Sequence, residues 1–380
     1  MRSTTISEWT LPTSRRLGLI AATIVAITIA VASTLSWDQR NAVVANAQQD
    51  LTNLGIVLAE QMTRSLQAVD LVLRDTAANM QARGLERPGQ FKELLAGEAI
   101  HDFLTEQLKH LPQADSLGLF SADGSLVNLS RHWPVPGLNI ADRDYFQQLR
   151  DHSEIDTFIS DPVKNRVTDT WTLFVGRRIS GPDGAFLGIV SSTIELSYLE
   201  EFYRTIAAQA DRSVTILRRD GTIIARYPHL EDRIGKKLPA GSPFYSHLAT
   251  DTALYRTVGG LDGVVRWVST HPLHDYPLAV SVTRAEPAML AGWWRQSIFI
   301  GISALTAITG FLLLFRALAA QFRRHEAAEA SLAERNLALE QSQAQLQRQA
   351  VELTRSAEAL ARSEERFRDF AQISSDWFWE

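Results

Sequence analysis

The sequence predicts an α+β protein in which two small antiparallel-sheet modules stand in tandem on a long N-terminal helix. Two transmembrane helices flank this part, and a parallel coiled coil follows it. Three observations predict the arrangement: two uncharged apolar segments at 17–35 and 297–315, glycine turns that recur between apolar runs, and a leucine repeated every seven residues towards the C-terminus.

Composition limits the classes of function. The chain has 380 residues, a formal net charge of -5 and no cysteine. This length predicts two or three domains, and weak acidity argues against a nucleic-acid partner, which needs a concentrated basic face. The absence of cysteine excludes disulfides and thiolate metal sites. His271 and His274 are three residues apart, but Pro272 prevents the regular helix that would align them on a metal. The sequence predicts no catalytic residue, cofactor or metal site.

The two apolar segments predict membrane spans at 17–36 and 297–315, because each is close to the roughly 20 residues that a helix needs to cross a bilayer. Arginines lie just before the first span and just after the second, among them Arg16 and Arg316. Positive residues favour the cytoplasmic side of a membrane. Residues 1–16 and the C-terminal part are therefore expected in the cytoplasm, and residues 37–292 in the periplasm of a bacterial inner-membrane protein.

A cleaved signal peptide is the alternative interpretation of the first apolar segment. Ala30-Val31-Ala32 resembles a cleavage site. We expect a span instead, because a signalling protein with a cytoplasmic coil gains little from losing its first anchor.

The segment between the spans begins with a predicted helix, 38–83, in which apolar residues recur at a three-four spacing. Two shorter helices broken near Gly55 are the alternative. Beyond it, the pattern changes to strands and tight turns, which predict a first module at about 100–195 and a second at about 211–285. The predicted turns are Asp123-Gly124, Asp183-Gly184, Asp220-Gly221 and Asp262-Gly263.

Residues 38–284 resemble a double Cache sensor domain. The resemblance rests on Asp142-Arg143-x-Tyr145-Phe146, on the later Trp171, and on an Arg-Arg-Ile run before a glycine turn. The segment "VTILRRDGTIIARYP" is similar to the start of the second, membrane-proximal module of that family. The resemblance implies two PAS-like modules in an extracytoplasmic receptor, with a small-molecule ligand held by the first, membrane-distal module.

The resemblance also implies a ligand site around "ADRDYF", where the family places an arginine and aromatic side chains that hold a carboxylate. A guanidinium pairs bidentately with a carboxylate, and aromatic rings cover the apolar part of a ligand. In the strand "TWTLFVGRRI", alternation separates the face of Trp171 from that of Phe174 and Arg178, and the sequence leaves open which face meets the pocket. The candidate ligand-binding residues are Arg143, Tyr145, Phe146, Asp161, Lys164, Trp171, Arg178 and Thr193.

The chain departs from the amino-acid-binding members of the family at three positions. Leu138 replaces a tyrosine, Tyr145 replaces a tryptophan, and Thr193 stands where an aspartate would hold an amino group. The sequence therefore favours a carboxylate or another polar metabolite over an amino acid. Taken singly, each candidate also fits a structural role, such as the solvated start of a helix at Arg143 or a core anchor at Phe146.

A heptad leucine repeat predicts a parallel homodimeric coiled coil at 316–366, with polar Asn336 at an a position of the seam. A solvated single helix is the alternative. If a ligand resets the register of this coil, crosslinking through cysteines at Leu339 and Gln343 should change with ligand. The repeated leucines are Leu332, Leu339, Leu346, Leu353 and Leu360.

The C-terminal "SEERFRDFAQISSDWFWE" resembles the entry of a PAS domain, with a first strand expected from Trp377. Residues 367–380 are then the start of a domain whose remainder is absent, and the chain is expected to be a fragment. The leading expectation is a sensor that passes ligand binding to cyclic-di-GMP synthesis or breakdown. A histidine kinase is the alternative output, and a chemoreceptor comes third. The expected partners are a small-molecule ligand, the lipid bilayer and a second copy of the chain.

Overall fold

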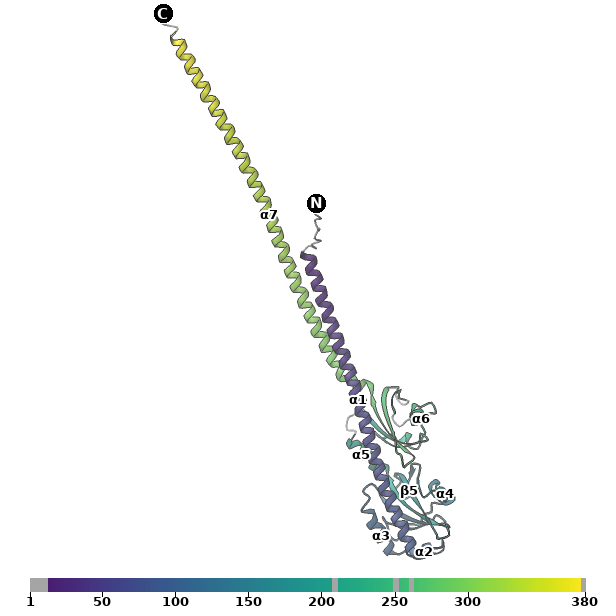
Figure 1. Cartoon of the computed structure of the whole chain (residues 1–380). Coiled ribbons are helices and arrows are strands. Elements are labelled where there is room, and N and C mark those ends of the chain that lie inside the picture. Colours follow the sequence, from purple (N-terminus) through teal and green to yellow (C-terminus); the bar gives the residue numbers. More distant parts are fainter. Residues whose placement is uncertain (1–12, 207–210, 249–252, 260–262, 377–380) are drawn as a thin grey trace. The chain divides into compact units, whose positions relative to one another are not determined.

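The structure is a computed structural model that describes residues 13–206, 211–248, 253–259 and 263–376 (Figure 1). The chain divides into two compact units. Unit 1 consists of Met1–Ser36 and Ser297–Glu380, and unit 2 is Trp37–Gln296.

Unit 1 is helical in its described residues and comes from two long helices, α1 (Thr13–Ala82) and α7 (Glu286–Asp376). Each helix contains a segment long and apolar enough to cross a membrane. Within the unit, the hydroxyl oxygens of Ser36 and Ser297 are 2.8 Å apart. Helix α7 continues to Asp376, so the strand expected from Trp377 lies outside the described residues.

Unit 2 contains two antiparallel sheets. In sheet 1 the strand order is β2-β1-β6-β5-β3, and the short β4 pairs with β5. In sheet 2 the order is β8-β7-β11-β10-β9, which repeats the order of sheet 1. The strands of sheet 1 are β1 (Ser116–Ser121), β2 (Leu126–Leu129), β3 (Thr157–Ile159), β4 (Val163–Lys164), β5 (Trp171–Ser180) and β6 (Phe186–Glu195). Those of sheet 2 are β7 (Arg212–Arg218), β8 (Ile223–Tyr227), β9 (Ala253–Val258), β10 (Val265–Pro272) and β11 (Leu278–Ala285).

Short helices connect and cover these strands. They are α2 (Gln90–Leu95), α3 (Glu98–Leu108), α4 (Asp144–Asp151), α5 (Leu196–Ile206), the 3-10 helix η1 (Glu231–Arg233) and α6 (Pro243–Leu248). The first strand pair of each sheet turns through an Asp-Gly step, at Gly124 and Gly221, whose φ angles of 81° and 87° suit glycine best.

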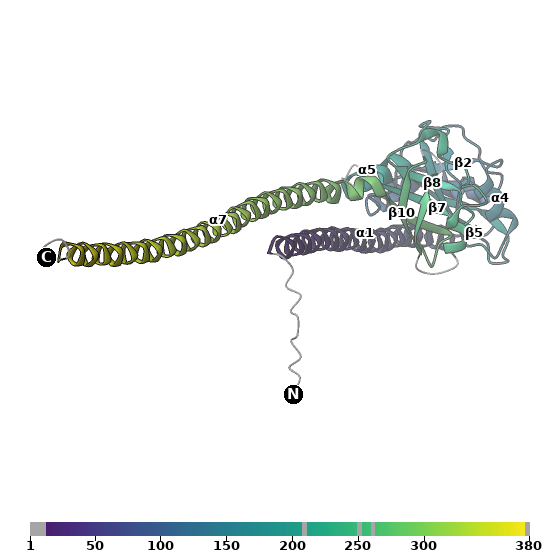
Figure 2. The ribbon, with the colours of Figure 1, turned by 90° about the horizontal axis from the view of Figure 1, so that it is seen from above.

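The part of α1 that belongs to unit 2 lies beside the strands (Figure 1, Figure 2). Its apolar stripe, which includes Leu58, Leu66 and Leu73, is fully buried in one core cluster with Val175 of sheet 1 and Val280 of sheet 2. Burying such a side chain contributes about 1.5–3 kcal/mol. The helix passes Gly55 without a break. The prediction of two antiparallel sheets with long flanking helices is confirmed, whereas the coiled coil and the PAS-like nature of the modules stay predictions.

Candidate functional site

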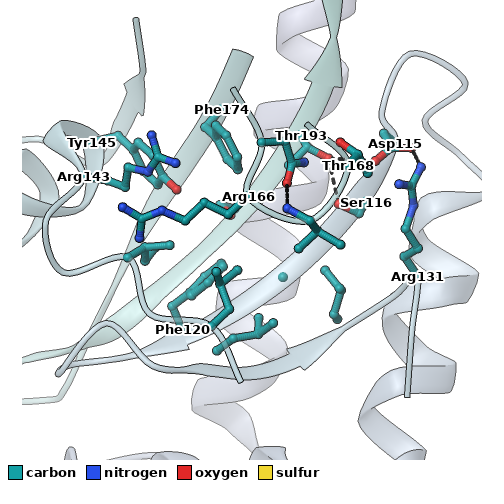
Figure 3. Close-up of a pocket in the computed structure, with 18 residues that line it drawn as sticks. Asp115, Ser116, Phe120, Arg131, Arg143, Tyr145, Arg166, Thr168, Phe174 and Thr193 are labelled. Atoms are coloured by element: carbon teal, nitrogen blue, oxygen red, sulfur yellow. Dashed lines mark hydrogen bonds and ion pairs between the residues drawn. The ribbon is translucent and has the colours of Figure 1, made fainter. Parts of the chain in front are cut away.

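A pocket lies on sheet 1, between the sheet and the loops that lead into α4 and β5 (Figure 3). Its empty space is about 560 Å³, with the part open to solvent included. Strand alternation explains which side chains reach it: Ser116, Gly118 and Phe120 of β1 are two residues apart, as are Ser191 and Thr193 of β6. This cavity is called the sheet-1 pocket below.

Two arginines lie at one side of the sheet-1 pocket. Arg143 precedes α4 in extended conformation, and one of its terminal nitrogens donates to the backbone oxygen of Lys164 at 3.2 Å. Arg166 donates to the backbone oxygen of Asn139 at 2.6 Å and to the Asp142 carboxylate at 2.5 Å. The Arg166 guanidinium holds the pKa of the Asp142 carboxyl below its usual value. A carbonyl acceptor fixes the Arg143 guanidinium without neutralising it, so its charge remains available to an anion.

Tyr145 stands between these arginines and the sheet. Its ring stacks on Phe174 of β5, with centroids 4.8 Å apart, and the residue is 1% exposed. Burial raises the pKa of Tyr145, so the phenol keeps its proton and can donate it in a hydrogen bond. No hydrogen bond involving this hydroxyl occurs among the residues that the structure describes. Figure 3 shows the ring beside Arg143, with the hydroxyl turned towards the middle of the pocket. The Tyr145 oxygen is not among the fully buried side-chain atoms that lack a partner, so it opens into the pocket, where a ligand oxygen could accept its hydrogen bond.

The other side of the pocket holds a polar cluster. Ser116 and Thr193 lie opposite each other on β1 and β6, and their hydroxyl oxygens are 2.7 Å apart. Asp115, one residue before β1, accepts from Thr193 at 3.5 Å and forms an ion pair with Arg131. Asp115 thus brings a carboxylate next to Thr193, but Arg131 already neutralises it.

Three of the eight candidate residues come together in the sheet-1 pocket: Arg143, Tyr145 and Thr193. Leu138, which departs from the amino-acid-binding pattern, lines it as well. The sequence left open which face of β5 lines the pocket. It is the face with Phe174, because Phe174 lines the pocket and Trp171 does not.

The other five candidate residues lie elsewhere in unit 2. Phe146 packs edge-on against Phe186, with ring centroids 5.6 Å apart. Arg178 donates to the backbone oxygen of Leu149 at 2.6 Å and lies over the same Phe186 ring. A ligand contact by either residue stays a prediction.

Asp161, Lys164 and Trp171 contact sheet 2 and the segment that follows β8. Asp161 pairs with Arg218 at 3.3 Å. Trp171 donates its indole N–H to Glu231 at 2.7 Å, and the Lys164 ammonium lies 3.9 Å from the same carboxylate. These side chains connect the two modules instead of lining the pocket, and their suggested contact with a ligand stays a prediction.

Most residues that line the pocket were not candidates in the sequence analysis, among them Asp115, Phe120, Arg131, Arg166 and Phe174. Phe174 could have been found, because alternation placed it on one of the two faces considered for β5. Within the described ranges, no group of three His, Cys, Asp or Glu side chains could hold a metal ion.

Comparison with known proteins places this architecture in a family. A family model described as Cache domain matches residues 37–293. The extracellular domain of rpHK1S-Z16, a predicted histidine kinase, is 30% identical over 66% of this chain and 99% of its own, with a TM-score of 0.57. The periplasmic sensory domain of the Campylobacter jejuni chemoreceptor Tlp1 is 13% identical over 65% and 98%, with a TM-score of 0.52, which shows the fold alone.

The ligand-binding domain of the Pseudomonas fluorescens chemoreceptor CtaA, solved with L-isoleucine, is 18% identical over 67% of this chain and 98% of its own, with a TM-score of 0.48. No curated protein matches the chain. The family match covers more than half of the chain and all of unit 2 up to residue 293. The chain therefore belongs to the Cache domain family.

Proposed function

We propose that the chain is the input part of a membrane-anchored sensor whose sheet-1 pocket binds a small carboxylate outside the cytoplasm. One observation carries the proposal: Tyr145, almost fully buried and without a hydrogen-bond partner among the described residues, turns its hydroxyl into a cavity lined by Arg143 and Arg166. A phenol donor beside the Arg143 guanidinium suits an anionic oxygen, whereas Arg166 already pairs with Asp142. Membership of the Cache family makes unit 2 a sensor module and not a catalytic one.

A carboxylate without an amino group is the ligand class that we favour. The Thr193 hydroxyl cannot balance an ammonium group, and the neighbouring Asp115 is engaged by Arg131. An α-amino acid is the second candidate, because Asp115 lies beside the very position where the amino-acid-binding members carry an aspartate. An amino acid would have to displace Arg131 from Asp115, which costs part of an ion pair.

The proposed topology has unit 2 in the periplasm and both ends of the chain in the cytoplasm. Two apolar helical segments flank the domain, and arginines precede the first segment and follow the second. The 30% identical relative is named as an extracellular domain, which supports the same placement.

The proposed relay uses helix α7, which is continuous from Glu286 to Asp376. The heptad leucines of its C-terminal half are exposed in the single chain, Leu339 by 59% and Leu353 by 71%. A second copy of the chain would cover this seam as a parallel coiled coil. Cyclic-di-GMP turnover through a following PAS domain is the output that we propose first. A histidine kinase is the alternative, supported by the name of the 30% identical relative.

Binding can be tested on the whole chain in nanodiscs by thermal unfolding with acetate, propionate, pyruvate, succinate and L-isoleucine. A ligand that binds only the folded state raises the unfolding midpoint by mass action. We expect a carboxylate to raise it in the wild type but not in Arg143→Gln. The matched control is Arg150→Gln, because Arg150 lies on α4, which Arg143 directly precedes, pairs with Asp151 and is outside the pocket. A carboxylate response that survives Arg143→Gln, or no response to any of these carboxylates, would contradict the proposal.

A further inference from the structure

A second cavity lies on sheet 2, between the strands and the segment 228–243 that includes η1 and the start of α6. Its empty space is about 2560 Å³, with open solvent included. All five strands of sheet 2 contribute to its lining. This cavity, called the sheet-2 pocket, lies apart from the residues that line the sheet-1 pocket.

The floors of the two pockets are built alike. In sheet 1, Ser116 of β1 lies opposite Thr193 of β6, and their hydroxyl oxygens are 2.7 Å apart. In sheet 2, Ser213 of β7 lies opposite Thr283 of β11, at 2.6 Å between hydroxyl oxygens. Both sheets have the same strand order, so these two pairs occupy equivalent positions. The face of sheet 1 that holds the sheet-1 pocket is therefore repeated in sheet 2.

One position on the repeated floor changes from apolar to cationic. Gly118 of β1 lies opposite Leu129 of β2, and the equivalent Thr215 of β7 lies opposite Arg226 of β8. The Arg226 guanidinium donates to the Thr215 hydroxyl at 3.0 Å and to the Ser213 hydroxyl at 3.4 Å. The two hydroxyl groups accept these hydrogen bonds without adding negative charge, and they orient the guanidinium across the floor. Where the sheet-1 pocket has a leucine, the sheet-2 pocket thus has an oriented cation.

The wider lining is rich in cations. Six of its side chains are arginines or lysines, and one is acidic, namely Asp211, which pairs with Arg284 at 2.5 Å. Half of these cations pair with carboxylates outside the lining: Lys237 with Asp220 at 2.6 Å, Arg233 with Asp232 at 3.4 Å, and Arg212 with Asp50. Lys236 is exposed at the rim. The charge of the lining favours an anion over a cation or a zwitterion.

The remaining wall is apolar and contains side chains from three parts of the module. They are Leu217 and Ile223 of the sheet, Leu230 and Leu238 of the connecting segment, and Tyr255 and Val268 of the far strands. Pockets of this composition, largely apolar with a few placed charges, are typical of sites for organic ligands. We propose that the sheet-2 pocket is a second binding site, specific for an organic anion with an apolar tail, such as a medium-chain carboxylate, whose anionic end meets Arg226.

The test uses equilibrium dialysis of octanoate against the whole chain in nanodiscs, with empty nanodiscs subtracted for partition into lipid. We expect saturable octanoate binding that Arg226→Gln weakens about tenfold or more, because a hydrogen bond to a charged group is worth that factor. The matched control is Arg204→Gln, since Arg204 is exposed on α5, pairs with Glu201 and lies outside the pocket. Octanamide, the neutral counterpart of octanoate, should bind at least tenfold more weakly than octanoate.

Further variants separate this site from the sheet-1 pocket. Arg143→Gln should leave octanoate binding unchanged, whereas loss of binding in that variant would place octanoate in the sheet-1 pocket and overturn the proposal. If Arg226→Gln does not fold, Lys236→Gln at the exposed rim should still reduce the affinity several-fold. Unchanged affinity in folded Arg226→Gln, or in Lys236→Gln where Arg226→Gln does not fold, would overturn the proposal. Equal binding of octanamide, or no saturable octanoate binding, would also overturn it.

Discussion

Tyr145 lies flat against Phe174, with ring centroids 4.8 Å apart and 8° between the ring planes. The contact joins the first turn of α4 to the middle of β5 and buries both rings. A stacked aromatic pair contributes about 0.5–1.5 kcal/mol beyond its area burial. Because the rings hold each other, the phenol oxygen is fixed at the pocket before any ligand arrives, which lowers the entropy cost of binding.

Tyr145→Phe should separate binding from stability. The change keeps the stack on Phe174 and removes a hydroxyl that opens into the pocket and has no hydrogen-bond partner among the described residues, so the free energy of unfolding should change by less than about 1 kcal/mol. The affinity for the carboxylate that gives the largest thermal shift should fall about tenfold. Calorimetric titration and thermal unfolding of the whole chain measure the two quantities. As a control, Tyr198→Phe on the exposed side of α5 should change neither. A stability loss above about 1 kcal/mol with unchanged affinity would indicate a purely structural hydroxyl.

Gly55→Ala should destabilise the fold, although alanine normally improves a helix. A Cβ atom at this position would lie 2.3 Å from Cδ2 of the buried His271 ring, so the ring must move. Overpacking of this kind costs about 1–3 kcal/mol. The control is Gly292→Ala in α7, where a Cβ meets nothing within 4 Å and a gain of up to about 1 kcal/mol is expected.

The reciprocal change tests the same contact. In a His271→Ala background, Gly55→Ala should cost much less, and the difference is the coupling energy of a double-mutant cycle. Denaturant unfolding of the four variants measures it. Additive effects of the two substitutions would show that the cost of Gly55→Ala arises elsewhere.

The sequence predicted the helices and strands of unit 2 better than the contacts between them. The three-four spacing from Leu51 to Leu73 identified the long helix, and Asp-Gly steps identified the hairpins, because both signals are local. The sequence could not show why the helix tolerates Gly55. The reason is His271, which is more than 200 residues away in the sequence and packs against the helix only in the folded chain.

The site was predictable where one short segment carries it. Arg143 and Tyr145 come from the same loop and helix, and the family resemblance located both. Asp115 and Arg131, in contrast, reach the pocket through the pairing of β1 with β6 and β2, which no local pattern encodes. Phe146 lies outside the sheet-1 pocket for a local reason: adjacent residues on a helix point about 100° apart, so it faces Phe186 while Tyr145 faces the pocket.

His229 should make the stability of unit 2 depend on pH. Its Nδ1 lies 2.6 Å from Glu200 and its Nε2 lies 2.9 Å from Glu231, which also contacts Lys164 and Trp171. The two carboxylates raise the pKa of His229 above its ordinary value of 6.5. A raised pKa in the folded state gives stability that is fully present below the ordinary value and is lost as the pH rises through the raised value. Because the side chain is 40% exposed, the effect should be on the order of a few tenths of a kcal/mol.

Denaturant unfolding at a series of pH values, from below the ordinary pKa of 6.5 upwards, checks this expectation, because the contribution is lost only above that value. The free energy of unfolding should fall with pH more steeply in the wild type than in His229→Gln. His132→Gln, at an exposed position of the same unit, should keep the wild-type slope. Identical slopes in the wild type and in His229→Gln would assign the pH dependence to other groups.

Leu339→Cys should crosslink two copies of the chain. Leu339 lies at a d position of the heptad repeat and is 59% exposed in the single chain, so a parallel coiled coil would bring the two equivalent side chains together across the seam. The chain has no cysteine of its own, so any disulfide reports the introduced residue alone. Oxidation of the variant in membranes, followed by non-reducing electrophoresis, should yield a dimer. Gln341→Cys, two residues away at an f position on the outer face of the same coil, should crosslink far more slowly. Equal rates at the two positions would indicate random collision of single helices and would remove the basis for a relay through a dimeric α7.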